Sequence, residues 1–179
     1  MRTRTAGWTA AAATALTLAG GLVSPAHAAS VTQQDAAFLK AAHQSNLAEI
    51  AAGLDAQVHA RSSCVKKVGA HFVADHRKLD ASVRDLARRL GVTLPTAPNA
   101  QQRSAAAQAK AQVGKAAYDS TWLSTEAAGH QTTLNAIDRE LRAGSNSQVV
   151  ALARTARPVV AGHLRLVSGG TCRTPATSG

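Results

Sequence analysis

The stretch CVKKVGAHFVADHRKLDASVRDLARRL, from Cys64 to Leu90, decides the fold of this chain. Its apolar residues recur at steps of three and four, which places them on one side of a long helix. They are Val65, Val68, Phe72, Leu79, Val83, Leu86 and Leu90. His76 takes a position in the same stripe, so the buried face of this helix is predicted to carry an imidazole.

Residues 1–28 are typical of a secretory signal peptide. Arg2 and Arg4 form a short basic region, residues 10–23 are apolar and rich in alanine, and Ala26-His27-Ala28 fits a cleavage site. A membrane anchor is the alternative, but the apolar run is short for a bilayer span. We therefore expect a mature protein without a transmembrane segment, secreted to the cell envelope or the exterior.

The charge of the chain points to no specific partner. The formal net charge of +10 becomes +8 when Arg2 and Arg4 leave with the signal peptide. The basic residues are spread along the chain, which favours solubility and at most weak contact with anionic envelope polymers. Aromatic residues make up only 3% of the sequence, too few for a base-stacking surface, so no nucleic-acid partner is expected.

Three further segments have helical periodicity. The first covers residues 31–60, where Thr32 is a suitable N-cap and Leu47, Ile50, Leu54 and Val58 form a stripe. The others cover residues 116–142 and the segment that follows the expected cap Ser147, in which Pro158 should kink or divide the helix. Because no segment alternates as a strand does, we predict an all-α four-helix bundle over residues 30–170, followed by a flexible tail, 171–179.

The connection between the second and third long helices leaves two topologies open. Residues 91–115, with a short helix expected over 101–113, can cross the full length of the bundle or loop out of a plain up-and-down path. The two cysteines bear on this choice, since an even number in an exported protein favours a disulfide over free thiols. A Cys64–Cys172 bond goes with the crossover, which puts the two cysteines at the same end.

Three of the four stripes carry a core histidine, namely His76, His130 and His163. Counting from the helix ends places all three near the middle of the bundle. A single buried histidine is ordinarily a neutral, hydrogen-bonded core residue. Three neighbouring imidazoles need mutual hydrogen bonds or a cation to satisfy their nitrogens, and imidazole is a common transition-metal ligand.

The first helix offers two residues that could complete this set. Glu49 lies on the flank of its stripe, whereas His43 lies one heptad before Ile50 and points more squarely inward. Glu126, four residues before His130, could be a ligand or orient one, but its position is more typical of a surface charge. Asp75 faces about 100° away from His76 and is not expected at the same inward position.

Four segments resemble a known family: AAFLKAAHQSNLAEIAAG, VKKVGAHFVADHRKLDASVRDLARRLGVTLP, YDSTWLSTEAAGHQTTL and ARPVVAGHL. They are similar to the exported bacterial domain of unknown function 4142, which belongs with the ferritin-like four-helix proteins. The more specific marks are the adjacent Asp75 and His76, His130, and the spacing of Pro158 and His163. The resemblance implies a ferritin-like bundle with a long crossover, and it implies Glu49 as the residue from the first helix.

The chain departs from the ferritin-like di-iron pattern. Such sites place a carboxylate three residues before the histidine on two helices, where this chain has Val73 and Val160. We therefore predict at most one transition-metal ion (Fe, Zn, Mn or Cu), held by Glu49, His76, His130 and His163. The resemblance brings no activity with it, and the sequence has no G-x-S-x-G or phosphate-binding motif. The first function considered is a metal-handling or oxidative-stress protein, and the alternative is a non-enzymatic envelope protein with a buried histidine network. The charge also leaves a third, weaker hypothesis of a basic protein that adheres to anionic wall polymers.

Overall fold

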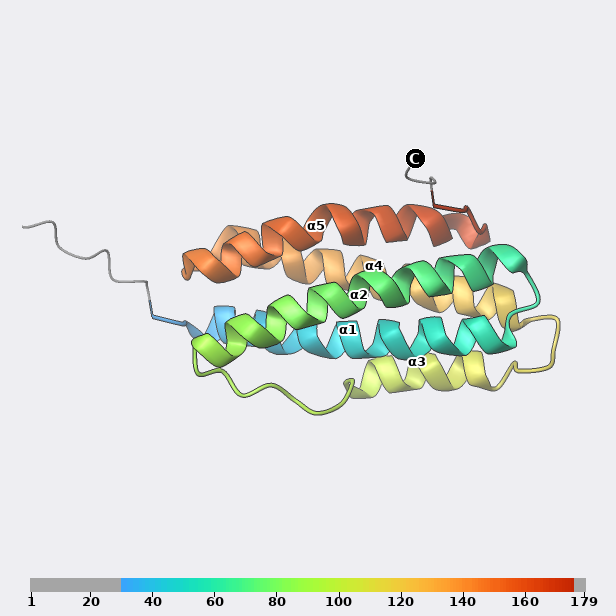
Figure 1. Ribbon diagram of the computed structural model, residues 1–179, viewed down its shortest axis with the longest axis horizontal. Helices are drawn as coiled ribbons and strands as arrows, with labels where there is room; N and C mark the ends of the chain where they lie inside the picture. Colours follow the sequence, from blue (N-terminus) through green and yellow to red (C-terminus); the bar gives the residue numbers. More distant parts are fainter. Residues whose placement is uncertain (1–29, 176–179) are drawn as a thin grey trace, which may run out of the picture.

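The computed structural model describes residues 30–175 (Figure 1). Its long helices are α1 (Gln33–His59), α2 (Ser63–Arg89), α4 (Tyr118–Ala143) and α5 (Ser147–Val167), with a short helix α3 (Ala100–Lys110) and a 3-10 turn η1 (Ser168–Gly170). The predicted all-helical bundle is confirmed. The predicted signal peptide and residues 176–179 of the predicted tail lie outside the described residues. In the described range, none of the helices is both long and apolar enough to cross a membrane.

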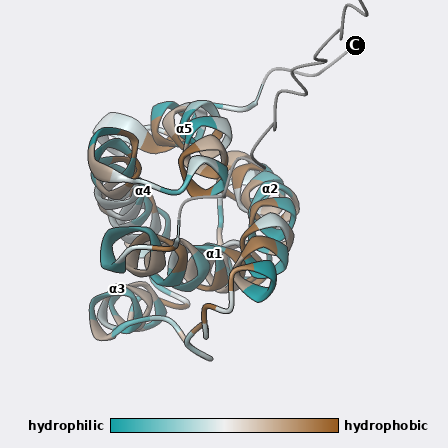
Figure 2. Cartoon of the chain, turned by 90° about the vertical axis from the view of Figure 1, so that its left-hand side faces the viewer, coloured by the Kyte–Doolittle hydropathy of each residue, from teal (hydrophilic) through white to brown (hydrophobic). Residues whose placement is uncertain are grey.

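The order of the helices follows the crossover topology. Helix α1 packs against α2 and α4 against α5, each pair joined by a short turn. The connection from α2 to α4 runs back along the bundle and places α3 on its outside, against α4 and α1 (Figures 1 and 2). Helices α2 and α4 therefore begin at the same end. Assignment to the ferritin-like class itself stays a prediction.

The two cysteines meet at that end. The Sγ atoms of Cys64, at the start of α2, and Cys172, after η1, are 2.07 Å apart. Beyond the bond, the backbone N–H of Arg173 donates to the carbonyl of Leu166 at 2.9 Å. The cysteine pairing expected for the crossover is present, and it fastens the described part of the tail to the bundle.

Caps and turns fix the helix ends, and two details differ from expectation. Thr32 caps α1 in a capping box with Asp35, as predicted. Helix α5 is capped by the side chain of Asn146, and not by Ser147. Helix α5 also continues through Pro158 as one element, so of the two expected effects, a kink or a division, the division does not occur. Pro158 and Arg154, whose carbonyl loses its helical partner, are both exposed, so water can satisfy that carbonyl.

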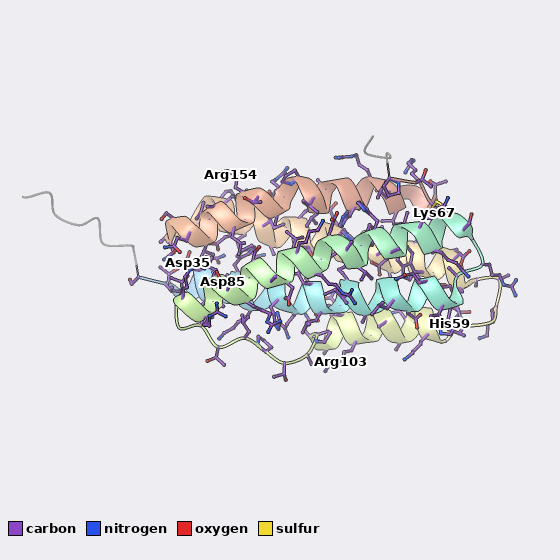
Figure 3. The ribbon with its side chains drawn as sticks, viewed as in Figure 1. Asp35, His59, Lys67, Asp85, Arg103 and Arg154 are labelled. Atoms are coloured by element: carbon purple, nitrogen blue, oxygen red, sulfur yellow. A yellow bond between two sulfur atoms is a disulfide. The ribbon has the colours of Figure 1, made fainter. Side chains whose placement is uncertain are left out.

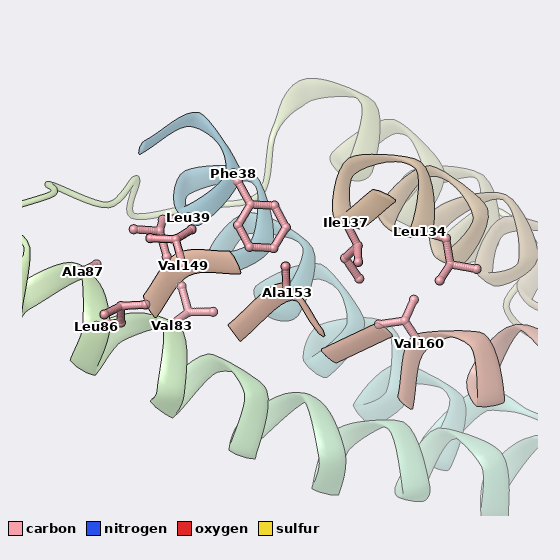
Figure 4. Packing of buried hydrophobic residues seen from close by; sticks show 10 residues of the cluster. All are labelled: Phe38, Leu39, Val83, Leu86, Ala87, Leu134, Ile137, Val149, Ala153 and Val160. Carbon is pink, nitrogen blue, oxygen red and sulfur yellow. The ribbon is translucent and has the colours of Figure 1, made fainter. Parts of the chain in front are cut away.

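Two apolar clusters fill the ends of the bundle. The first joins the start of α1 to the end of α2 and includes Phe38, Leu39, Val83, Leu86, Ile137 and Val149 (Figure 4). The second lies at the disulfide end and includes Val65, Val68, Phe72, Tyr118, Trp122 and Leu123. Between them, every long helix contributes buried polar side chains. A layer of buried polar side chains therefore lies between the two apolar clusters.

Helix α1 turns a different face inward from the one predicted. Leu54 and Val58 are 44% and 70% exposed, whereas Asn46, Glu49 and Gly53 are buried. The polar side chains find partners on other helices, and Gly53 lets α1 approach α2 closely: a Cβ there would lie 2.5 Å from the carbonyl oxygen of Gly69. Close packing and polar partners thus outweigh the burial of two aliphatic side chains.

The surface charge is distributed, as the sequence indicates. Lys67, Arg103 and Arg154 are exposed on α2, α3 and α5 respectively (Figure 3). Some of the charge is locally paired, as where Arg157 of α5 donates to Asp138 of α4 at 2.6 Å. The basic residues labelled in Figure 3 therefore belong to three separate helices and form no common patch.

Candidate metal centre

The polar layer contains three imidazoles from three helices. His76 of α2, His130 of α4 and His163 of α5 are 1%, 1% and 2% exposed. One ring nitrogen from each lies within 4.8 Å of the others. The ring centroids are 5.1 to 5.6 Å apart. The three histidines thus surround one point in the core.

The outer nitrogen of His76 is held by α1. Its Nδ1 lies 2.9 Å from Oδ1 of Asn46, also buried. An amide oxygen only accepts, so Nδ1 carries the proton and donates. Nε2 of the neutral ring then carries a lone pair, which faces the interior toward His163.

The outer nitrogen of His130 is held by its own helix. Nδ1 donates to the carbonyl oxygen of Glu126, one turn earlier, at 2.8 Å. Nε2 is buried without a hydrogen-bond partner, and Oε2 of Glu49 lies 3.7 Å from it. His130 therefore also directs a lone pair into the core.

His163 connects the core to the surface. Its Nε2 lies 3.2 Å from Oδ2 of Asp75, and its Nδ1 lies 3.2 Å from Nε2 of His76. A carboxylate oxygen only accepts hydrogen bonds, so Nε2 carries the proton. Nδ1 therefore carries the third lone pair that faces inward. As expected, Asp75 does not share the inward position of His76. From its flank of α2 it instead meets the imidazole of α5, a contact that the sequence analysis did not predict.

Burial keeps the three rings neutral. It lowers the pKa of His76 well below its usual range, and nearby His130 and His163 lower that pKa further. Burial lowers the pKa of His163 to about 4, against the opposing effect of Asp75. The pKa of His130 is also lowered by burial, against the opposing effect of Glu126. At neutral pH the interior nitrogens are therefore bases.

Two carboxyl groups also lie close to His130. Glu49 of α1 and Glu126 of α4 are each 6% exposed, so the interpretation of Glu126 as a surface charge was wrong. Burial raises the pKa of Glu49 to about 7, with a hydrogen bond from Glu126 opposing the rise. Burial and the neighbouring charge of Glu49 raise the pKa of Glu126 well above its usual range. Glu126 therefore keeps its proton at neutral pH, and Glu49 is the carboxyl group of the pair that ionises first.

The second option from α1, His43, lies elsewhere. Its Nδ1 is 2.6 Å from Oδ1 of Asp80, and both side chains are buried. His43 thus makes a separate buried pair with α2, while Glu49 is the α1 residue beside His130. Val73 and Val160, where a di-iron pattern would have carboxylates, are buried apolar residues.

Two sets of potential ligands share His130. The first is His76, His130 and His163, and the second is Glu49, Glu126 and His130. The ring of Phe72 closes one side of the imidazole set, 4.4 Å from the ring of His163 and 4.7 Å from that of His130. Sequence reasoning placed the histidines in one layer but missed Asn46 as a partner, because an asparagine in a weakly patterned, alanine-rich helix carries no signal of its own.

The comparison with known proteins identifies the family of this chain. It finds no relative whose activity is established. No curated protein and no solved structure matches the chain. The model of the family described as Domain of unknown function (DUF4142) matches residues 21–168, which is most of the sequence, and the chain therefore belongs to this family.

Proposed function

We propose that this chain is an exported helical-bundle protein that binds one transition-metal ion (Fe, Zn, Mn or Cu) in its core, with a role in metal handling or oxidative stress. His76, His130 and His163 supply three nitrogen ligands. Glu49, 3.7 Å from His130, is the fourth ligand. Such a mixed nitrogen and oxygen set suits several first-row ions.

The observation that carries this proposal is the direction of the imidazole protons. Each ring donates its outer proton to a fixed acceptor: the amide of Asn46, the backbone carbonyl of Glu126 and the carboxylate of Asp75. Three lone pairs are then left facing one another in a buried space. Metal-bound histidines are oriented in the same manner, by an outer partner that fixes the tautomer.

The spacing of the inward nitrogens supports the same conclusion. Nε2 of His76 and Nδ1 of His163 are 3.2 Å apart. Two nitrogens on a tetrahedral ion, each about 2.0–2.1 Å from it, are about 3.3 Å apart. A cation between the rings replaces the repulsion of two lone pairs by two coordinate bonds.

The carboxyl pair supplies the charge that a buried cation needs. Above pH 7 Glu49 is ionised while Glu126 keeps its proton, which leaves one negative charge beside His130. A divalent ion in an apolar interior is costly without such a counter-charge. The ion would in turn lower the pKa of Glu49 and keep it ionised.

A second candidate is a metal-free envelope protein stabilised by a histidine network. The contacts from Asp75 through His163 and His76 to Asn46 are 3.2, 3.2 and 2.9 Å, all within hydrogen-bond range. One proton between His163 and His76 would satisfy both rings, provided that one of them gives up its outer donation. In this function Nε2 of His130 and Oε2 of Glu49 remain without hydrogen bonds.

Elemental analysis and thermal unfolding of the mature protein decide between the two. Metal binding predicts about one equivalent of a transition metal after reconstitution and a melting temperature that a chelator lowers. The His76→Ala/His130→Ala variant should lose both effects. If the wild type held less than a tenth of an equivalent of any transition metal and took up none of the four ions, metal binding would be rejected. The metal-free protein with a histidine network would then be the remaining candidate.

A further inference from the structure

A third set of potential ligands lies between the core and the surface. One ligand atom each from His71, Asp75 and His163 lies within 4.8 Å of the others. His71 and Asp75 are one turn apart on α2, with Nε2 of His71 3.5 Å from Oδ2 of Asp75. The same oxygen lies 3.2 Å from Nε2 of His163. One carboxylate oxygen thus lies between two imidazole nitrogens.

This set is open to solvent, unlike the core. The side chains of His71 and Asp75 are 36% and 24% exposed, whereas that of His163 is 2% exposed. All three line a surface hollow with Pro158, Gly162 and Arg165 of α5. Lys78 contacts the other carboxylate oxygen of Asp75, at 3.5 Å, which leaves Oδ2 to the imidazoles. An ion from solvent can reach these atoms without opening the bundle.

His163 belongs to this outer set and to the core set at once. Its Nε2 faces Asp75 and its Nδ1 faces His76. A neutral imidazole carries one proton, so it presents a lone pair on one side at a time. With the proton on Nε2, Nδ1 is available to the core. With the proton on Nδ1, donated to Nε2 of His76, Nε2 is available to the outer set.

We propose that His71, Asp75 and His163 form a second, solvent-facing transition-metal site through which ions reach the core. The proposal rests on the proposed function, since it supplies the route to that core site. The two sites use opposite tautomers of His163 and are filled alternately. The ring keeps one proton throughout, so transfer of the ion inward needs only the shift of that proton from Nδ1 to Nε2.

A second histidine–aspartate pair, on α1, serves as the control for the proposed metal site. It has the same spacing as His71 and Asp75 and a similar exposure, but no third ligand beside it among the described residues. His59 and Asp55 have the same one-turn spacing, at 3.8 Å, and exposures of 35% and 24% (His59 is labelled in Figure 3). Asp55 instead accepts the hydroxyl of Tyr118 at 2.6 Å, and the pair belongs to none of the three ligand sets of the described residues. His59→Ala is therefore the control for His71→Ala.

The test is the rate at which metal-free protein takes up Co²⁺, followed by its visible absorption after rapid mixing. His71→Ala should load at least about 10-fold more slowly than the wild type and reach the same final occupancy, while His59→Ala should load at the wild-type rate. Equal rates for His71→Ala and the wild type would overturn this inference alone. No uptake by the wild type would overturn the proposed function as well.

A second measurement detects the outer site directly. In His130→Ala the core has lost one ligand, while His71, Asp75 and His163 are intact. Equilibrium dialysis against Co²⁺ should show weak residual binding in His130→Ala, reduced at least about 10-fold by adding His71→Ala and unchanged by adding His59→Ala. Equal binding by His130→Ala and His71→Ala/His130→Ala would contradict the outer site.

Discussion

Nδ1 of His163 lies 3.2 Å from Nε2 of His76, although the opposite nitrogen of each ring already has an acceptor. Two hydrogen-bond acceptors at this distance in a buried layer need either a proton or a cation between them. The outer partners of the rings decide which is present, because they set the tautomers. The predictions below concern these partners, the carboxyl pair and the packing that holds the layer in place.

Asn46→Ala should weaken metal binding without removing a ligand. His76 then loses the acceptor for Nδ1–H, and its ring is no longer fixed with Nε2 inward. We expect a loss of about 10–100-fold in affinity, measured by competition with a chelating dye. Ser45→Ala is the control, since it removes a neighbouring hydrogen bond, to Thr133 at 2.8 Å, that does not involve a ligand. Equal losses in the two variants would argue against the tautomer explanation.

Glu49→Gln should change the pH dependence of stability of the metal-free protein. The pKa of Glu49 is 4.5 in the reference state and about 7 in the fold, so the folded state binds more protons between these values. Stability is therefore retained below pH 4.5 and falls as the pH rises to 7, by about 3 kcal/mol.

Urea unfolding of both proteins at pH 4, 6 and 8 measures this effect. Relative to the wild type, Glu49→Gln should gain up to about 3 kcal/mol between pH 4 and pH 8. The comparison at pH 4 corrects for the loss of native contacts that the substitution causes at every pH. Parallel profiles would show that the Glu49 carboxyl is not held protonated by burial.

Gly53→Ala should destabilise the bundle. The added Cβ would lie 2.5 Å from the carbonyl oxygen of Gly69 and 2.8 Å from Cγ2 of Val73, so α1 and α2 must separate. We expect a loss of about 1–3 kcal/mol in the free energy of unfolding. Gly162→Ala is the control, because its Cβ would meet only Nη2 of Arg165, at 3.6 Å, and alanine favours the helix. An unchanged free energy of unfolding in Gly53→Ala would contradict the close approach of α1 to α2.

Removing the disulfide should also destabilise the protein. The bond joins residues separated by 108 positions and so restricts a long loop of the unfolded chain. Cys64→Ser/Cys172→Ser should lower the free energy of unfolding by about 2–5 kcal/mol. A reductant should bring the wild type to the same value and leave the variant unaffected. A wild type whose stability is unchanged by reduction would show that the bond does not form.

The long helices and the layer of histidines could be predicted from the sequence because they depend on periodicity. Val65, Phe72, His76 and Val83 recur at helical spacing, so their common face follows from the geometry of the helix alone. The depths of His130 and His163 follow from counting along their helices. The cysteine pairing was predicted together with the crossover, since the even number of cysteines favoured a bond and only the crossover puts the two at the same end.

The rotation of each helix about its axis could not be predicted in the same way. On α1, hydropathy favoured the side of Leu54 and Val58, yet the side of Asn46 and Glu49 is buried. Those two side chains gain partners on α2 and α4, which are distant in sequence. Glu126 was misjudged and the contact of Asp75 with His163 was missed for the same reason, since their surroundings depend on where a neighbouring helix lies.

X-ray absorption at the metal edge of the zinc-loaded protein tests the central claim most directly. The account predicts three imidazole nitrogens at about 2.0–2.1 Å from the ion. His76→Ala, His130→Ala and His163→Ala should each remove one of them. His43→Ala, which breaks the buried pair with Asp80, should leave all three. An ion surrounded by oxygen ligands only, or unchanged nitrogen coordination in those three variants, would contradict a shared histidine centre.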